Sequence, residues 1–339
     1  MSRCNIEEKK MISQLLNDVE KDAKPECCLL CGKKIDSFCN SHVVPRFVLK
    51  EIADNGMISY GQSLYNESMK NPLYNTTKGI NNAFTFKLIC NQCDKKTFAE
   101  YEDPKSVMNF ETLNYDMKNL VLSEMAIKTH LEHIGRKSKD YILKCKTHPE
   151  MVELFRNVGT AEEIDIVDHL DYIKKLLKNR KSTSFPFRIL YDKLLDYRCD
   201  IACQTLICYI YDLKGNKIYE PKDFSSGDYT RYFYLMILPY KAKTRVLFYI
   251  EKRNVQFVEN IVSQFNELTE DEKLHFLFIS LIIFEESFYI RPSLKENMLK
   301  DRKLIKLYKE TDNLVSFDSC IKIKDFRKYN NYLLEQKQK

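Results

Sequence analysis

The chain has 339 residues, and its 54 Lys and Arg against 48 Asp and Glu give a formal net charge of +6. With 44% hydrophobic and 30% charged residues, and only 8 Gly and 9 Pro, the composition is typical of a soluble globular protein. It excludes collagen-like, low-complexity and disordered classes, and the length suits about two ordinary domains.

Two features predict a cytoplasmic protein that has no membrane partner. The first residues, MSRCNIEEKKMISQ, lack the apolar core of a secretory signal. The longest apolar stretch, at 276–284, is about half of the ~20 residues that a membrane-spanning helix needs.

Composition and spacing divide the chain into four predicted parts. We expect an N-terminal amphipathic helix at 1–24, a small metal-binding module at 25–104, a larger domain at 105–290 and a basic helical tail at 291–339. The N-terminal helix is predicted from apolar residues at helical spacing, namely Ile6, Met11, Ile12, Leu15, Leu16 and Val19.

Two CxxC pairs predict a structural zinc site in the module. The four cysteines are Cys28, Cys31, Cys90 and Cys93. Each pair can place two thiolates on one ion with little strain, and two pairs complete a tetrahedral shell. Gly32 follows the first pair, where a tight turn favours a residue that tolerates positive φ. Cys27 and Cys39 are competing ligands, and the alternative is a set of buried core cysteines without metal.

The residues between the cysteine pairs carry a likeness to a known family. Ser-His-Val-Val-Pro occupies 41–45, and the second pair lies within 88–97. The order of these motifs resembles the HNH, or ββα-metal, nuclease superfamily. More narrowly, the chain is similar to HNH-related bacterial proteins that have Ser-His-x-x-Pro and a later Tyr-Glu pair, as at Tyr101-Glu102. The likeness covers about 25–104, and it implies a small zinc-stabilised ββα module.

The resemblance implies a metal-dependent endonuclease, of the kind found in restriction or anti-phage (antiviral defence) proteins. Hydrolysis of a phosphodiester needs a base for water and a cation for the phosphate charge. By resemblance, His42 is the general base, Asp94 takes the place of the metal ligand on the helix, and Glu102 is a second oxygen ligand. The implied catalytic cation is Mg²⁺ or Mn²⁺.

Two positions depart from the family pattern. Ser41 stands where an acidic residue or His binds the catalytic metal, and Phe84 stands where the family has Asn, with Asn81 and Asn82 slightly too early. The alternative function is therefore a catalytically inactive zinc-binding module that docks nucleic acid or a partner protein. His42 would then bind the structural zinc or cap a helix turn.

A second set of metal-ligand residues follows the module. It consists of His130, His133, Cys145 and His148. The two histidines share one face of a predicted helix, so a second metal site is one interpretation and a solvated helix end is the other.

The larger domain is predicted to have an α+β fold. Apolar residues recur at helical spacing from Val107 to Ile127, and helical patterns continue to Leu177. Three strand-like runs follow, at 205–211, 232–238 and 244–250. Helices return at 255–265 and 271–287. This order predicts helices around an antiparallel sheet, in a domain that recognises a substrate or partner.

The charge excess lies entirely in the tail. Residues 291–339 contain 13 basic and 7 acidic side chains, whereas the rest of the chain is balanced. The candidate contacts with a DNA or RNA backbone are Lys295, Lys300, Arg302, Lys303, Lys306 and Lys309, with further cations at 322–328. A solvated helix face is the alternative. A protein partner or a second copy of the chain is the other expected kind of partner.

Overall fold

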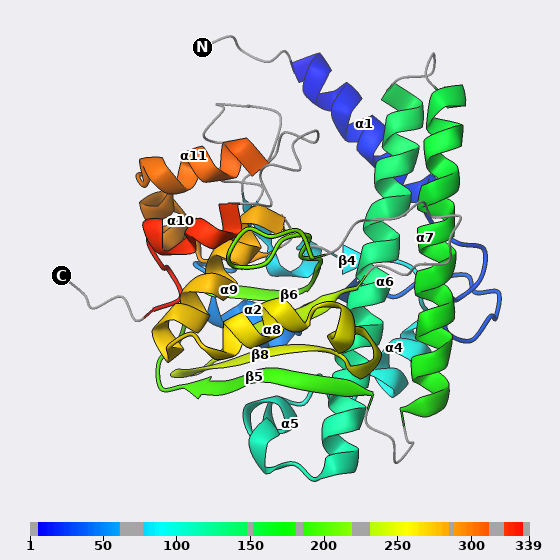
Figure 1. Cartoon of the computed structure of the whole chain (residues 1–339). Coiled ribbons are helices and arrows are strands. Elements are labelled where there is room, and N and C mark those ends of the chain that lie inside the picture. The colour runs from blue at the N-terminus through cyan, green and yellow to red at the C-terminus, as the bar shows by residue number, and fades with distance from the viewer. Residues whose placement is uncertain are drawn as a thin grey trace.

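The computed structural model combines helices with an antiparallel sheet, as the sequence predicted (Figure 1). It describes residues 6–61, 77–83, 85–147, 152–180, 186–218, 231–284, 288–311 and 322–334. Within these ranges, no helix has the length and apolar character that a bilayer crossing requires.

Ten α-helices occur in the described ranges. They are α1 (Ile6–Asp22), α2 (Arg46–Glu51), α4 (Asn91–Thr97), α5 (Pro104–Met108), α6 (Tyr115–Thr147), α7 (Val152–Asn179), α8 (Glu259–Asn266), α9 (Glu270–Phe284), α10 (Pro292–Met298) and α11 (Arg302–Thr311). The long helices α6 and α7 lie side by side along one edge of the molecule (Figure 1). Helix α9 starts with a charged first turn, and from Leu274 onward it is largely apolar on all sides, as is typical of a helix buried in the core.

The strands form one large sheet and one small two-stranded antiparallel sheet. They are β1 (Ser41–His42), β2 (Met57–Tyr60), β3 (Thr77–Gly79), β4 (Thr85–Phe86), β5 (Phe187–Leu195), β6 (Ile201–Ile207), β7 (Phe233–Tyr240), β8 (Lys243–Glu251) and β9 (Tyr289–Ile290). The seven-stranded sheet has the order β3-β2-β9-β6-β7-β8-β5, and β1 pairs with β4 separately. Strands β2 and β3 come from the expected module, so the module and the larger domain share one sheet.

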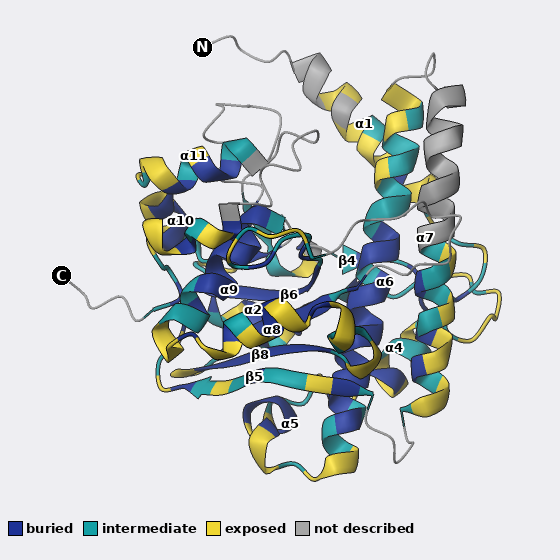
Figure 2. Cartoon of the chain, viewed as in Figure 1, coloured by how far each residue is buried: buried dark blue, intermediate teal, exposed yellow. Residues whose placement is uncertain are grey.

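The central strands separate two hydrophobic cores. Because successive strand residues point to opposite faces, Phe233 and Leu235 of β7 belong to the core that contains α8 and α9. Tyr234 and Met236 belong to the other core, which contains the middle of α6 and the residues around the cysteine pairs. Figure 2 shows the central strands and most of α9 as buried. The module thus packs against the sheet through the same core as α6.

Candidate functional site

The two cysteine pairs meet in one group. The metal-binding atoms of Cys28, Cys31, Cys90 and Cys93 all lie within 4.8 Å of one another. Four thiols at this spacing fit the tetrahedral sulfur shell of Zn²⁺. Among the residues that the structure describes, no other group of three or more His, Cys, Asp or Glu side chains meets this spacing. The predicted four-cysteine group is therefore present and can hold a metal ion such as zinc.

Local backbone geometry positions each pair. Gly32 has φ +68°, and its N–H donates to the carbonyl of Cys28 over 2.8 Å, which closes the first turn. The second pair begins α4, where the N–H of Cys93 donates to the Cys90 sulfur over 3.4 Å. The N–H of Leu29 donates to the carbonyl of Leu88 over 3.0 Å and joins the two segments.

The environment of Cys28 favours its thiolate form. Burial raises the pKa of this thiol, but N–H groups of Cys90, Cys31 and Leu30 donate to its sulfur and outweigh burial, so its pKa falls to about 7. The thiolate is the form that binds a metal.

The competing ligands of the prediction lie outside the four-cysteine group. Cys39 donates its S–H to Oδ2 of Asp94 over 3.4 Å. Burial and the charge of Asp94 raise the pKa of Cys39 to about 12, so it stays a thiol. Neither Cys27 nor His42 belongs to the group either.

His42 lies at the end of β1, opposite Thr85 of β4. Its Nε2 is 2.8 Å from the carbonyl oxygen of Ile80. A carbonyl can only accept a hydrogen bond, so Nε2 carries the proton in this contact and the lone pair is left on Nδ1. Burial lowers the pKa of His42, and the charges of Lys128 and Arg46 lower it further. The neutral imidazole is therefore favoured near pH 7.

Asp94 and Glu102 converge, but they converge on a lysine. The Nζ atom of Lys128, on α6, lies 3.5 Å from Oδ1 of Asp94 and also contacts the Glu102 carboxylate. Ser41 donates its hydroxyl to the same Asp94 oxygen over 2.6 Å. Only 1% of the Lys128 side chain is exposed, and its ammonium lies 4.5 Å from the ring centre of Phe98.

These contacts do not form a preformed divalent-cation site. His42, Asp94 and Glu102 are not among the groups of side chains with metal-ligand spacing. The positive charge between the two carboxylates is the Lys128 ammonium. Lys128 was not among the site residues predicted from the sequence. Its one signal is its place directly after the apolar run Met125–Ile127.

The second predicted ligand set is not brought together. His130 and His133 are buried on α6. Cys145 lies twelve residues beyond His133 on the same helix, which is about 18 Å along the axis. His148 lies outside the described residues.

A histidine from another helix joins the first two instead. Nδ1 of His169, on α7, contacts Nδ1 of His130, and Nε2 of His130 is 2.8 Å from the hydroxyl of Tyr234. The ring of His133 stacks on His169 with centroids 4.3 Å apart. The three imidazoles thus join α6, α7 and β7 in a buried polar cluster rather than in a metal-ligand group.

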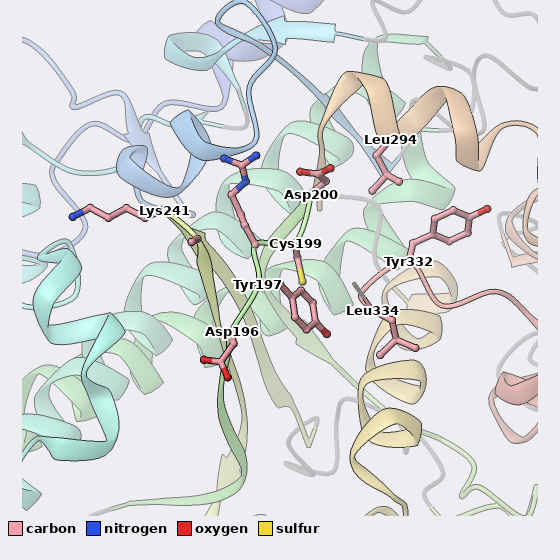
Figure 3. A pocket seen from close by; sticks show the side chains of 10 residues that line it. Asp196, Tyr197, Cys199, Asp200, Lys241, Leu294, Tyr332 and Leu334 are labelled. Carbon is pink, nitrogen blue, oxygen red and sulfur yellow. The ribbon is translucent and has the colours of Figure 1, made fainter. Parts of the chain in front are cut away.

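A cavity of about 550 Å³ lies beside residues 196–200, the segment that connects β5 to β6 (Figure 3). It is lined by Asp196, Tyr197, Arg198, Cys199, Asp200, Lys241, Ala242, Leu294, Tyr332 and Leu334. The charges in its lining are balanced and mostly paired: Asp200 lies 2.7 Å from Arg291, and Arg198 lies 3.7 Å from Glu51. The cavity therefore offers no strong preference for a charged ligand.

The predicted basic contacts of the tail fall into three groups. Lys295 is buried on α10, so it does not face a partner in this structure. Lys306 is exposed and lies 3.9 Å from Glu310, and Lys309 is half-buried. The remaining residues, Lys300, Arg302 and Lys303, are exposed around the start of α11.

Comparison of the chain with protein-family models, with curated proteins and with solved structures finds no match. The likeness to HNH nucleases therefore depends on the motifs between Cys28 and Glu102 alone. Function has to be inferred from the geometry of the site rather than from related proteins.

Proposed function

We propose that this protein is an HNH-like endonuclease that hydrolyses phosphodiester bonds in DNA or RNA, with His42 as the general base. A zinc ion bound by the four cysteines would fix the two-stranded sheet of β1 and β4 against α4 without touching the substrate. A role in antiviral defence follows only from the bacterial proteins that the motifs resemble.

The observation that carries this proposal is the contact between His42 and Ile80. A general base needs an accessible lone pair and a fixed tautomer. The carbonyl of Ile80 takes the proton on Nε2, so Nδ1 is the atom that would accept a proton from water. The lowered pKa of His42 keeps that lone pair available near neutral pH.

Lys128 decides how a cation could take part. In the family that the motifs resemble, Mg²⁺ or Mn²⁺ stabilises the charge on the phosphate. Here the Asp94 and Glu102 carboxylates are engaged by the Lys128 ammonium. A divalent ion would have to displace that ammonium before it could bind both carboxylates.

The same ion pair favours a second candidate function. A module in which Lys128 occupies the space between the two carboxylates, and Ser41 replaces an acidic ligand, would bind nucleic acid or a protein without cleaving it. In this candidate function the zinc site is still structural, but His42 has no catalytic role.

A nuclease assay with matched variants separates the two candidates. Purified protein is incubated with supercoiled plasmid or single-stranded RNA, in Mg²⁺, Mn²⁺ or EDTA. We expect cleavage by the native chain and a loss of at least about 100-fold in His42→Ala. His275→Ala is the control, because His275 is another partly buried histidine whose pKa burial lowers, but it packs against Phe326.

Melting temperature and zinc content of each variant show whether it is folded. Cleavage that is equal in the native chain and His42→Ala would contradict the role of His42. No cleavage of either substrate under any cation condition, by a folded and zinc-loaded chain, would favour the binding module.

A further inference from the structure

The two basic stretches near the end of the chain meet in one pocket. A cavity of about 540 Å³ lies between the α10–α11 junction and the segment after 327. Its lining consists of Asn297, Lys300, Asp301, Arg302, Lys303, Lys328, Asn330 and Tyr332. We call this cavity the basic pocket. It contains four cationic side chains and one acidic side chain.

The one acidic residue helps to build the wall of the pocket. Oδ1 of Asp301 accepts hydrogen bonds from the N–H groups of Lys303 and Leu304, both over 3.1 Å, and so caps α11. Its Oδ2 accepts from Asn330 over 2.7 Å and from Tyr332 over 3.2 Å. Four donors therefore already offset the charge of this carboxylate.

The cations of the basic pocket differ in how far they are compensated. Lys328 lies 2.8 Å from Asp325. Lys300, Arg302 and Lys303 are exposed, and none of the ion pairs between described residues involves them. Like charges gathered around one hollow repel one another, so an anion that enters it is stabilised.

We propose that the basic pocket binds a phosphate group. Arg302 can hold two phosphate oxygens at once, and Lys300 and Lys303 act as point charges on either side of it. The amides of Asn297 and Asn330 add neutral donors. The phosphate is that of a nucleic-acid backbone. This choice of source rests on the proposed function, whereas the binding of a phosphate group by the basic pocket does not rest on it.

Binding without cleavage tests this proposal. Full-length, zinc-loaded His42→Ala protein, in a buffer without added Mg²⁺ or Mn²⁺, is titrated into a fluorescein-labelled 20-nucleotide single-stranded DNA and an RNA of the same sequence, and anisotropy is measured. Separate arms use ATP and inorganic pyrophosphate as competitors. Because no arm requires hydrolysis, a failed nuclease assay and a failed binding assay are distinct results.

Arg302→Gln and Lys306→Gln form a matched pair. Both residues are exposed cations on α11, but only Arg302 lines the basic pocket. We expect Arg302→Gln to weaken oligonucleotide binding by about threefold to tenfold and to lower the salt slope by about one, and Lys306→Gln to change binding by less than about twofold. The triple variant Lys300→Gln/Arg302→Gln/Lys303→Gln should abolish most binding while keeping the native melting temperature.

Three results would overturn the proposal in different ways. Equal weakening by Arg302→Gln and Lys306→Gln would show a general charge effect and no pocket. Binding of neither oligonucleotides nor ATP and pyrophosphate would remove the phosphate site. Binding of ATP or pyrophosphate that depends on Arg302, with oligonucleotide binding that does not, would overturn nucleic acid as the source of the phosphate.

Discussion

The Lys128 ammonium lies 3.5 Å from a carboxylate oxygen of Asp94, and only 1% of the Lys128 side chain and 14% of the Asp94 side chain are exposed. Lys128→Met keeps the aliphatic stem but removes the charge that compensates Asp94 and Glu102. Since breaking a buried pair leaves an unpaired charge behind, we expect the free energy of unfolding to fall by on the order of 3 kcal/mol. Urea unfolding measures the change.

Lys174→Met is the control for this substitution. Lys174 pairs with Asp171 over 2.9 Å, but 70% of its side chain is exposed, so its loss should cost less than about 0.5 kcal/mol. Equal stability changes in Lys128→Met and Lys174→Met would refute the importance of the buried pair.

Lys128→Met should also bind Mn²⁺ between the Asp94 and Glu102 carboxylates, which the ammonium no longer engages. Electron paramagnetic resonance would detect the bound ion.

The four-cysteine group predicts one zinc ion per chain. Cys93→Ser should lose that ion and lower the melting temperature, because the two cysteine pairs then no longer clamp α4 to the first turn. Cys27→Ser should keep the zinc, since Cys27 lies outside the group although it adjoins Cys28. Metal analysis and thermal unfolding check both. Retention of zinc in Cys93→Ser would point to another ligand.

The proposed cleavage should persist into mildly acidic solution. Burial lowers the pKa of His42 below its ordinary value of 6.5. The base must be neutral to accept a proton, so kcat/KM should rise with pH through the lowered pKa and be level near pH 7. A pH–rate profile between pH 5 and 8 tests this. An acidic limb with its midpoint above 6.5 would be inconsistent with His42 in this environment.

Glu124 should make the folded state less stable as the pH rises. Burial raises the pKa of its carboxyl group from 4.5 to about 7, although the N–H of Tyr101 donates to it over 2.9 Å. The folded chain therefore binds more protons than the unfolded chain between these values, and stability decreases with pH across that window.

Glu124→Gln removes this ionisation while it keeps an oxygen acceptor for the N–H of Tyr101. We expect the variant to be more stable than the native chain at pH 8, by on the order of 2 kcal/mol, and similar to it at pH 4.5. Chemical unfolding at both pH values measures the difference. An equal gain in stability at pH 4.5 and pH 8 would mean that the ionisation of Glu124 is not the cause of the gain.

Sequence patterns predicted the parts of the site that depend on local spacing. Each CxxC pair is one turn, and the preference of zinc for four sulfurs joins the two pairs. The strands β7 and β8 were also expected, because the sequence there is rich in aromatic and β-branched residues. The four-cysteine group and the strands β7 and β8 are therefore confirmed predictions. The strand expected at 205–211 begins earlier, as β6 at Ile201–Ile207.

The other contacts join residues with no shared local pattern. Lys128 reaches Asp94, and His169 reaches His130, only because α6 packs against both the module and α7. The strand β9 has two residues, which is too short for any periodicity to reveal. Tertiary packing, rather than intrinsic propensity, decides the Lys128–Asp94 contact, the His169–His130 contact and the formation of β9.

The position of β9 also bears on how the chain folds during synthesis. Tyr289 and Ile290 pair with β2 on one side and with β6 on the other. The ribosome makes β2 early, yet its inner neighbour emerges only after most of the chain has been translated. The first third of the protein therefore cannot complete its part of the sheet before β9 has been made. Because this strand pairing is non-local, we expect folding to be largely post-translational and slow.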